Sequence, residues 1–228
     1  MLYKNTSFFL RKIVGPAIAE NAINALKNPY SKCEDDYKCI FVHVPKAAGK
    51  SIARSLLDAK NSTGHNKIAH YEKNKNKFSE YKKITVVRNP WDRLVSAFFY
   101  LRNLEEGTNG RVFFDGNVGR GISFNEFVLN LESSDYKKKV LRWQHFSPQT
   151  WFLRDSRGRI EFDFIARVES LEEDYKILKK IVNPNAGALR VVNKSKHSDY
   201  RSYYDQKTMN IVSQVYEDDI RELGYFFK

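Results

Sequence analysis

The sequence predicts an α/β fold in which a central parallel sheet is flanked by helices. Short apolar runs that read as buried strands alternate with segments of helical periodicity, which is the pattern of strand–helix–strand units. The first of these runs leads directly into a glycine-containing turn and a helix. The chain has 228 residues, of which 42% are hydrophobic and 14% aromatic, so it can bury a sizeable core.

The first strand–turn–helix segment covers residues 39–60. Residues 39–44 form a near-continuous apolar run, which is typical of a strand buried on both faces. Residues 51–60 follow with helical periodicity, because Ile52 and Leu56 lie on one stripe. This arrangement is the one in which a phosphate-binding loop is found.

The turn itself is an atypical phosphate-binding loop. Its end, Gly49-Lys50-Ser51, fits the pattern G-x-x-x-x-G-K-[ST]. Five positions before Gly49 that pattern requires a second glycine, but the chain has Val44, and Lys46 lies in the middle of the turn. We therefore expect a P-loop-like three-layer fold whose loop holds an anion other than the usual nucleoside triphosphate.

The later elements repeat the alternation. Residues 83–87 read as a second strand, and Pro90 suits the first turn of a following helix. A third strand is expected over 160–168, followed by a capping-box pattern at 170–173 that opens another helix. A last helix is expected over 206–223, where apolar residues share one face.

The predicted domain organisation is a single domain over residues 38–228. It is preceded by a helical extension, residues 1–37, which either packs on the body or lies on a membrane surface. Residues 103–150 have weaker periodicity, with one helix expected after Ser123. In a phosphate-loop fold an insertion at this place commonly builds the acceptor side of the site.

Charge and cysteine usage narrow the class of partner. Lys and Arg number 39 against 27 Asp and Glu, which gives a formal net charge of +12 and favours an anionic partner such as a nucleotide, a nucleic acid, an acidic glycan or a membrane surface.

Two cysteines are too few for a disulfide scaffold, and no spacing suggests zinc. No apolar window reaches the length of a membrane span, so we expect a cytoplasmic protein.

The first predicted anion site lies at the end of the first strand. The backbone amides of Ala48, Gly49, Lys50 and Ser51 would point at a bound anion at the N-terminus of the following helix. Lys46 can reach over that anion, and Ser51 can add its hydroxyl. The alternative is an ordinary strand–helix turn with a solvated lysine.

The second predicted anion site lies at the end of the second strand. An ATPase or kinase would need an acidic residue there to hold magnesium, but the strand ends in Arg88, with Ser96 eight positions later. A guanidinium and a hydroxyl suit a second phosphate and do not bind a metal. The alternative for Arg88 is a surface ion pair with Asp92.

These residues carry a family resemblance. The segment Val-Pro-Lys-Ala-Ala-Gly-Lys-Ser at 44–51 resembles the 5′-phosphosulfate loop of sulfotransferases that use 3′-phosphoadenosine-5′-phosphosulfate (PAPS). The segment at 87–97, which contains Arg-Asn-Pro-Trp-Asp-Arg, resembles their 3′-phosphate motif. The similarity is greatest to the bacterial members of the carbohydrate branch, which includes chondroitin sulfotransferases, and it extends to the segments 145–149, 163–171 and 203–226. One departure is Ala-Ala-Gly-Lys at 47–50, where Thr-Gly-Gly-Thr is commoner.

The resemblance implies a role for each loop residue. Lys46 would contact the phosphosulfate bridge, the amides of 48–51 would cradle it, and Arg88 and Ser96 would hold the 3′-phosphate. Lys194 and Ser195 resemble a tail segment that closes over the nucleotide, although a solvated basic loop is the alternative. PAPS would be the sulfuryl donor, adenosine 3′,5′-bisphosphate the product, and no metal would be required.

The resemblance also implies a general base between or near the two nucleotide motifs. His65 follows a glycine at the expected start of a helix and is the first candidate. His70 is the second, with a place on a helical face as its alternative. His145 is the third, although it could instead orient Trp143 or bind the acceptor.

The predicted function is transfer of a sulfuryl group to a hydroxyl of a carbohydrate, which would be a glycan, polysaccharide or glycolipid. Two other functions remain open at this point. One is a small-molecule or nucleotide kinase with a degenerate loop, and the other is a non-catalytic basic module that binds polyanions. No nucleic-acid-binding motif is found in the sequence.

Overall fold

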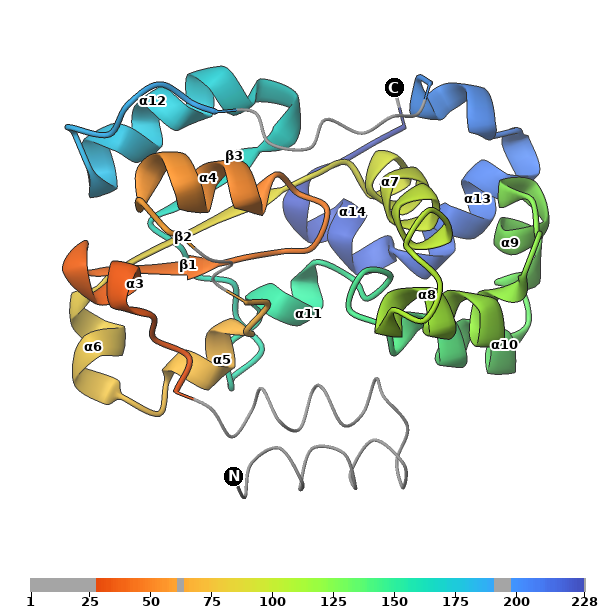
Figure 1. Ribbon diagram of the computed structural model, residues 1–228, viewed down its shortest axis with the longest axis horizontal. Helices are drawn as coiled ribbons and strands as arrows, with labels where there is room; N and C mark the ends of the chain where they lie inside the picture. The colour runs from red at the N-terminus through yellow and green to blue at the C-terminus, as the bar shows by residue number, and fades with distance from the viewer. Residues whose placement is uncertain (1–27, 61–63, 191–197, 228) are drawn as a thin grey trace. The chain divides into compact units, whose positions relative to one another are not determined.

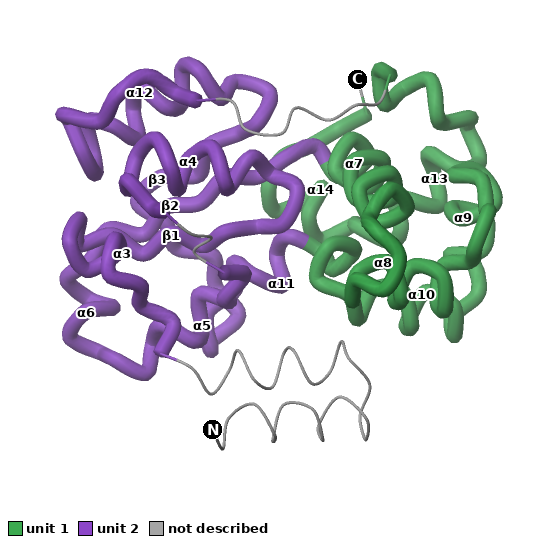
Figure 2. Tube along the Cα trace, in the orientation of Figure 1, with its two compact units in different colours: residues 1–27, 90–148, 195–228 green, residues 28–89, 149–194 purple. Residues whose placement is uncertain are grey.

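The computed structural model describes residues 28–60, 64–190 and 198–227 (Figure 1). The described residues divide into two compact units (Figure 2). Unit 2 holds residues 28–60, 64–89 and 149–190, and unit 1 holds residues 90–148 and 198–227. Residues 1–27 of the expected helical extension lie outside the described residues, and the single domain over 38–228 stays a prediction.

Unit 2 contains a parallel sheet of three strands in the order β1-β2-β3. The strands are β1 (Cys39–Val42), β2 (Lys82–Val87) and β3 (Phe164–Arg167). In the register of the sheet Phe41 lies opposite Ile84, and Ile84 lies opposite Phe164. Strands joined by long helical connections therefore run in one direction, which confirms the predicted α/β class with helices flanking a parallel sheet.

The helices of unit 2 are α3 (Lys32–Asp36), α4 (Gly49–Leu56), α5 (Ile68–Tyr71), α6 (Lys75–Glu80), α11 (Thr150–Leu153) and α12 (Leu171–Val182). Helices α4 and α12 share one apolar core with the sheet, to which Ile52, Val86 and Leu178 contribute buried side chains. Helices α5, α6 and α11 lie on the other side of the strands (Figure 1). The sheet is therefore a middle layer, as expected.

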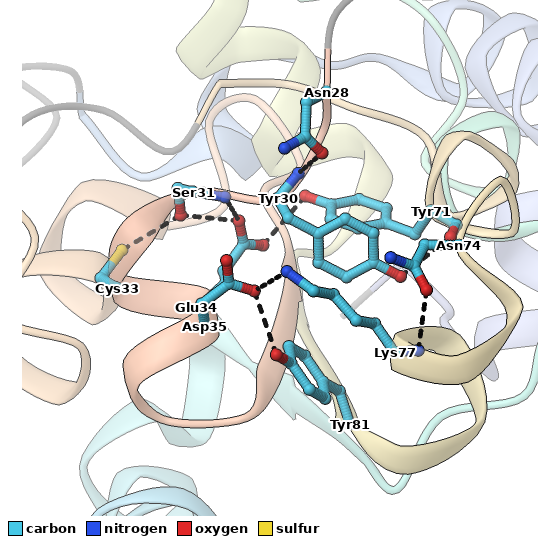
Figure 3. A network of polar contacts seen from close by, with 10 residues as sticks. All are labelled: Asn28, Tyr30, Ser31, Cys33, Glu34, Asp35, Tyr71, Asn74, Lys77 and Tyr81. Atoms are coloured by element: carbon cyan, nitrogen blue, oxygen red, sulfur yellow. Dashed lines mark hydrogen bonds and ion pairs between the residues drawn. The ribbon is translucent and has the colours of Figure 1, made fainter.

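The start of unit 2 is fixed by a buried carboxylate network (Figure 3). Glu34 on α3 is fully buried and accepts hydrogen bonds from the amide and hydroxyl of Ser31 at 2.8 and 2.7 Å, from the amide of Phe41 at 3.1 Å and from the hydroxyl of Tyr71 at 2.9 Å. Burial raises the pKa of Glu34, although these donors oppose the shift. Because Phe41 is in β1 and Tyr71 in α5, one side chain holds α3 and α5 to the first strand.

Two details of unit 2 differ from the sequence-based expectation. The third strand is limited to Phe164–Arg167 because those residues alone face partners on β2, at Ile84 to Val87. The predicted capping box at 170–173 is wrong. Ser170 is the last residue of a single turn of 3₁₀-helix, and its hydroxyl donates to Asp174 at 3.0 Å and caps no amide.

The described residues of unit 1 form helices joined by turns and contain no strand. Its elements are α7 (Pro90–Arg102), α8 (Asn109–Phe113), the π-helix η1 (Phe114–Gly119), α9 (Phe124–Asn130), α10 (Ser134–Leu141), the 3₁₀-helix η3 (Tyr200–Tyr203), α13 (Gln206–Val215) and α14 (Glu217–Leu223). Phe98 is fully buried at the centre of an aromatic core, with the rings of Phe114 and Phe127 both at 5.2 Å. The helix expected after Ser123 is confirmed as α9, with Glu126 completing a capping box.

The helix expected over 206–223 is interrupted in the structure. Tyr216 separates α13 from α14 with φ of −114°, outside the helical range. Its buried hydroxyl donates to the carbonyl of Phe146 at 2.7 Å. This tertiary hydrogen bond accounts for the bend, because the apolar face continues through Tyr216 in the sequence.

Candidate active site

The loop between β1 and α4 has an unusual backbone conformation. Lys46 and Ala48 both adopt left-handed angles, with φ of 68° and 57°. Such angles are uncommon for residues other than glycine and cost about 1–2 kcal/mol each, and they often mark functional sites. The resembled pattern Thr-Gly-Gly-Thr would put glycine at position 48, where this chain has the less permissive Ala48.

The loop leaves backbone donors open at the N-terminus of α4. No hydrogen bond from the amides of Ala48, Gly49 or Lys50 is found among the described residues, whereas the amide of Ser51 donates to the carbonyl of Ala48 at 2.9 Å. The predicted cradle of four amides is therefore reduced to three, because Ser51 closes the first turn of the helix. An anion at this place would be bound by these amides and by the dipole of α4.

Gly49 is required by a close approach of His43, the residue that follows β1. A Cβ atom at position 49 would lie 1.9 Å from Cδ2 and 2.1 Å from Nε2 of the buried His43 ring. No side chain fits there without a shift of the ring or the loop. The imidazole of His43 therefore packs directly against the loop backbone.

Three cations gather at the loop. Burial, followed by repulsion from Arg88 and Lys50, lowers the pKa of Lys46 to about 8. The guanidinium of Arg88 donates from Nη1 to the carbonyl of Lys46 at 3.2 Å. The end of the second strand thus contributes its cation to the loop that follows the first strand, which is the arrangement expected of an anion site.

The backbone of Arg88 is held by a buried glutamine. Gln149 accepts a hydrogen bond from the amide of Arg88 at 2.9 Å and donates to its carbonyl at 2.8 Å, so its side-chain amide pairs with Arg88 as a neighbouring strand would. The next residue, Asn89, donates its amide to Glu169 at 2.6 Å. These contacts fix the direction in which the turn after β2 leaves the sheet.

His65 contacts His43, the residue that follows β1. Its Nδ1 lies 2.8 Å from the carbonyl oxygen of His43, and the two rings are 4.3 Å apart. A carbonyl only accepts hydrogen bonds, so Nδ1 carries the proton and the neutral ring has its lone pair on Nε2. This is the tautomer that a general base needs. His65 precedes α5 in an irregular segment and does not start a helix.

The other two candidate bases lie elsewhere. His70 is half-buried on α5, where burial and the positive charges of Lys67 and Lys73 lower its pKa. His145 belongs to unit 1, where its ring stacks at 5.2 Å on Tyr100. The structure thus places His65 in contact with His43, whose ring packs against Gly49 of the loop.

The remaining predicted ligands are placed as follows. Ser96 is buried on the second turn of α7 in unit 1. Lys194 and Ser195 lie outside the described residues. In the part of the chain that the structure describes, no cluster of His, Cys, Asp and Glu could hold a metal ion, and no helix is long and apolar enough to cross a membrane.

Three residues of the site were missed or undervalued by the sequence analysis. His43 falls within the apolar run at 39–44, Glu169 follows the strand expected over 160–168, and Gln149 appears only within the family-like segment 145–149. The signal for Gln149 was its place in His-Phe-Ser-Pro-Gln, but nothing in the spacing shows that it pairs with a residue 61 positions earlier.

Comparison with known proteins agrees with this geometry. Residues 30–226 match the model of the sulfotransferase family, and the chain therefore belongs to that family. Carbohydrate sulfotransferase 8 of Mus musculus is 24% identical over 200 residues, which cover 73% of this chain and 46% of that protein. Carbohydrate sulfotransferase 9 of Homo sapiens is 25% identical over 221 residues, which cover 81% of this chain and 47% of that protein. The chain thus spans about half the length of these curated relatives. No solved structure gives a significant match.

Proposed function

We propose that the protein transfers a sulfuryl group from PAPS to a hydroxyl of a carbohydrate. The observation that carries this proposal is the gathering of Lys46, Lys50 and Arg88 around a loop with three open amides, in a chain of the sulfotransferase family. The carbohydrate acceptor is inferred from the names of the two relatives. A glycan of a polysaccharide or glycolipid is the acceptor that we expect.

Residues of unit 2 can supply both the general base for the acceptor and the groups that stabilise the leaving phosphate. The acceptor hydroxyl would give its proton to Nε2 of His65 while its oxygen forms a bond to sulfur. The bond between sulfur and the bridging oxygen of the donor would break, and adenosine 3′,5′-bisphosphate would leave. Lys46 and the amides of Ala48, Gly49 and Lys50 would stabilise the negative charge that develops on the leaving phosphate. Arg88 would bind the 3′-phosphate, and the role of Ser96 stays a prediction from the family resemblance.

The proposal is tested by transfer of label from [³⁵S]PAPS to a panel of desulfated polysaccharides. Lys46→Ala should lower kcat by at least about tenfold while changing the affinity for adenosine 3′,5′-bisphosphate less, because its charge is needed most in the transition state. Lys180→Ala, at an exposed lysine of α12 in the same unit, is the control and should retain kcat. Absence of labelled polysaccharide with the unaltered protein, or unchanged kcat in Lys46→Ala, would contradict the proposal.

A further inference from the structure

Lys67 is a half-buried lysine whose ammonium has no acidic partner among the described residues. Its Nζ lies 3.2 Å from the centre of the Trp151 ring, on α11. Burial alone lowers the pKa of Lys67 to about 8, and no carboxylate opposes that shift. Lysines elsewhere in unit 2 do find acids, as Lys77 does with Asp35 at 2.6 Å. A desolvated cation is costly without a counter-ion, and an aromatic face compensates only in part.

His70 has an unused nitrogen one helical turn further along. Its Nδ1 is buried and has no hydrogen-bond partner in the part of the chain that the structure describes. Residues three apart on a helix face the same side, and Lys67 is close enough to affect the charge of His70. A buried nitrogen without a partner costs roughly 1–3 kcal/mol. Two neighbouring groups that can donate hydrogen bonds thus lack an acceptor.

The nearest acid in the sequence does not fill this role. Glu72 accepts a hydrogen bond from the amide of Ser156 at 3.3 Å. The charged groups that act on His70 are Lys67 and Lys73, both of which are cationic. The local surroundings therefore favour an anion supplied from outside the chain.

The position of these residues relates them to the acceptor. Lys67 follows the candidate base His65 by two positions, and Trp151 follows Gln149, which holds Arg88, by two positions. All of them belong to unit 2. Trp151 is half-buried, whereas Trp91 and Trp143 are only 3% and 8% exposed in the core of unit 1.

We propose that Lys67, His70 and Trp151 form an acceptor subsite that binds an acidic sugar residue. The ammonium of Lys67 and the imidazole of His70 bind the carboxylate of a uronic acid. The half-buried indole of Trp151 packs against the sugar ring. We expect a carbohydrate ligand because the subsite rests on the proposed function. We expect an acidic one because neither the ammonium of Lys67 nor Nδ1 of His70 has an acidic partner among the described residues. The subsite selects acidic glycans as sulfuryl acceptors.

Tryptophan fluorescence tests the subsite without any donor. The full chain is titrated with chondroitin oligosaccharides, which contain uronic acid, and with the same oligosaccharides after chemical reduction of their carboxyl groups. The acidic ligand should change the fluorescence and bind at least about tenfold more tightly than the reduced one, the scale of one charged hydrogen bond. Trp151→Phe should abolish most of the fluorescence change, because the other two tryptophans are buried in unit 1.

Variants at Lys67 separate recognition from folding. Lys67→Gln should reduce the preference for the acidic ligand severalfold, and so should His70→Gln. Lys67→Arg keeps the positive charge and should retain the preference. Lys180→Gln removes an exposed positive charge on α12 of the same unit and should leave the preference unchanged. Equal binding of the two ligands by the unaltered protein would contradict the proposed subsite. So would an unchanged preference in a folded Lys67→Gln variant.

A failure of the proposed subsite can be distinguished from a failure of the proposed function. Binding of adenosine 3′,5′-bisphosphate is measured on the same preparations and should be the same in Lys67→Gln as in the unaltered protein. If that binding is normal and the preference for uronic acid is absent, the subsite is wrong and the proposed function stands. If the bisphosphate does not bind, the proposed function fails, whatever the fluorescence shows.

Discussion

Gly49 is the residue of the loop with the least room for change. Because a Cβ atom there would lie 1.9 Å from the His43 ring, Gly49→Ala forces the ring or the loop to move. We expect the substitution to weaken binding of adenosine 3′,5′-bisphosphate by at least about tenfold, since the open amides of the cradle would be displaced. Isothermal titration calorimetry measures this loss.

Two further variants identify steric conflict as the cause. Gly187→Ala is a matched control in the same unit, because a Cβ atom there meets nothing within 4 Å, and it should bind as the unaltered protein does. Combining Gly49→Ala with His43→Ala removes the obstructing ring and should recover much of the lost affinity. If Gly49→Ala alone binds normally, the close packing of His43 on the loop has no functional role.

Lys46 gives the site a pH dependence whose sign can be derived. In the free protein the pKa of Lys46 is lowered to about 8 by burial and by its cationic neighbours. A bound anion favours the charged form, so it raises this pKa, and binding at pH 8 takes up about half a proton. The affinity for adenosine 3′,5′-bisphosphate should therefore fall as the pH rises above 8.

Calorimetry in buffers of different ionisation enthalpy measures that proton uptake directly. Lys46→Gln should abolish the uptake, whereas Lys50→Gln should leave most of it, because burial and Arg88 lower the pKa of Lys46 more than Lys50 does. Binding at pH 8 without proton uptake would show that the anion does not contact Lys46.

The turn between β2 and α7 is the element on which the second anion site depends. Gln149 makes two hydrogen bonds to the backbone of Arg88, so Gln149→Leu removes both and leaves the side-chain volume similar. We expect about tenfold weaker binding of adenosine 3′,5′-bisphosphate, and a similar loss in Arg88→Ala. Thermal unfolding of each variant shows whether the fold persists.

A double-mutant cycle decides whether Gln149 acts through Arg88. If Gln149 only positions the guanidinium, the two losses will not add in the double variant, since the second substitution removes nothing further. Additive losses would show that Gln149 contributes to binding independently of Arg88.

The elements were predictable from the sequence where a local signal was strong. β1, β2 and the start of α7 at Pro90 are close to the predicted bounds, because the first apolar run ends at Pro45 and the second is followed three positions later by Pro90. The bend at Tyr216 and the short β3 were not predictable. The first depends on a hydrogen bond to Phe146, and the second on which residues find a partner across the sheet.

At the scale of the whole molecule, the sequence identifies the loops that would bind the sulfuryl donor, but it does not identify the residues that hold these loops in place. Lys46 and Gly49 lie in one contiguous motif, so their chemistry can be inferred from spacing. The pairing of Gln149 with Arg88 and of Trp151 with Lys67 joins residues far apart in the chain, and only the folded structure brings them together. The surplus of positive charge predicts an anionic partner without specifying it.

The central claim is that the protein binds a doubly phosphorylated adenosine, not a nucleoside polyphosphate with magnesium. Isothermal titration calorimetry of the full chain with adenosine 3′,5′-bisphosphate and with ADP, each with and without magnesium, tests it most directly. We predict that the bisphosphate binds at least about tenfold more tightly than ADP, that magnesium makes no difference, and that Arg88→Ala removes most of the preference. Equal binding of ADP, or binding that needs magnesium, would contradict the account.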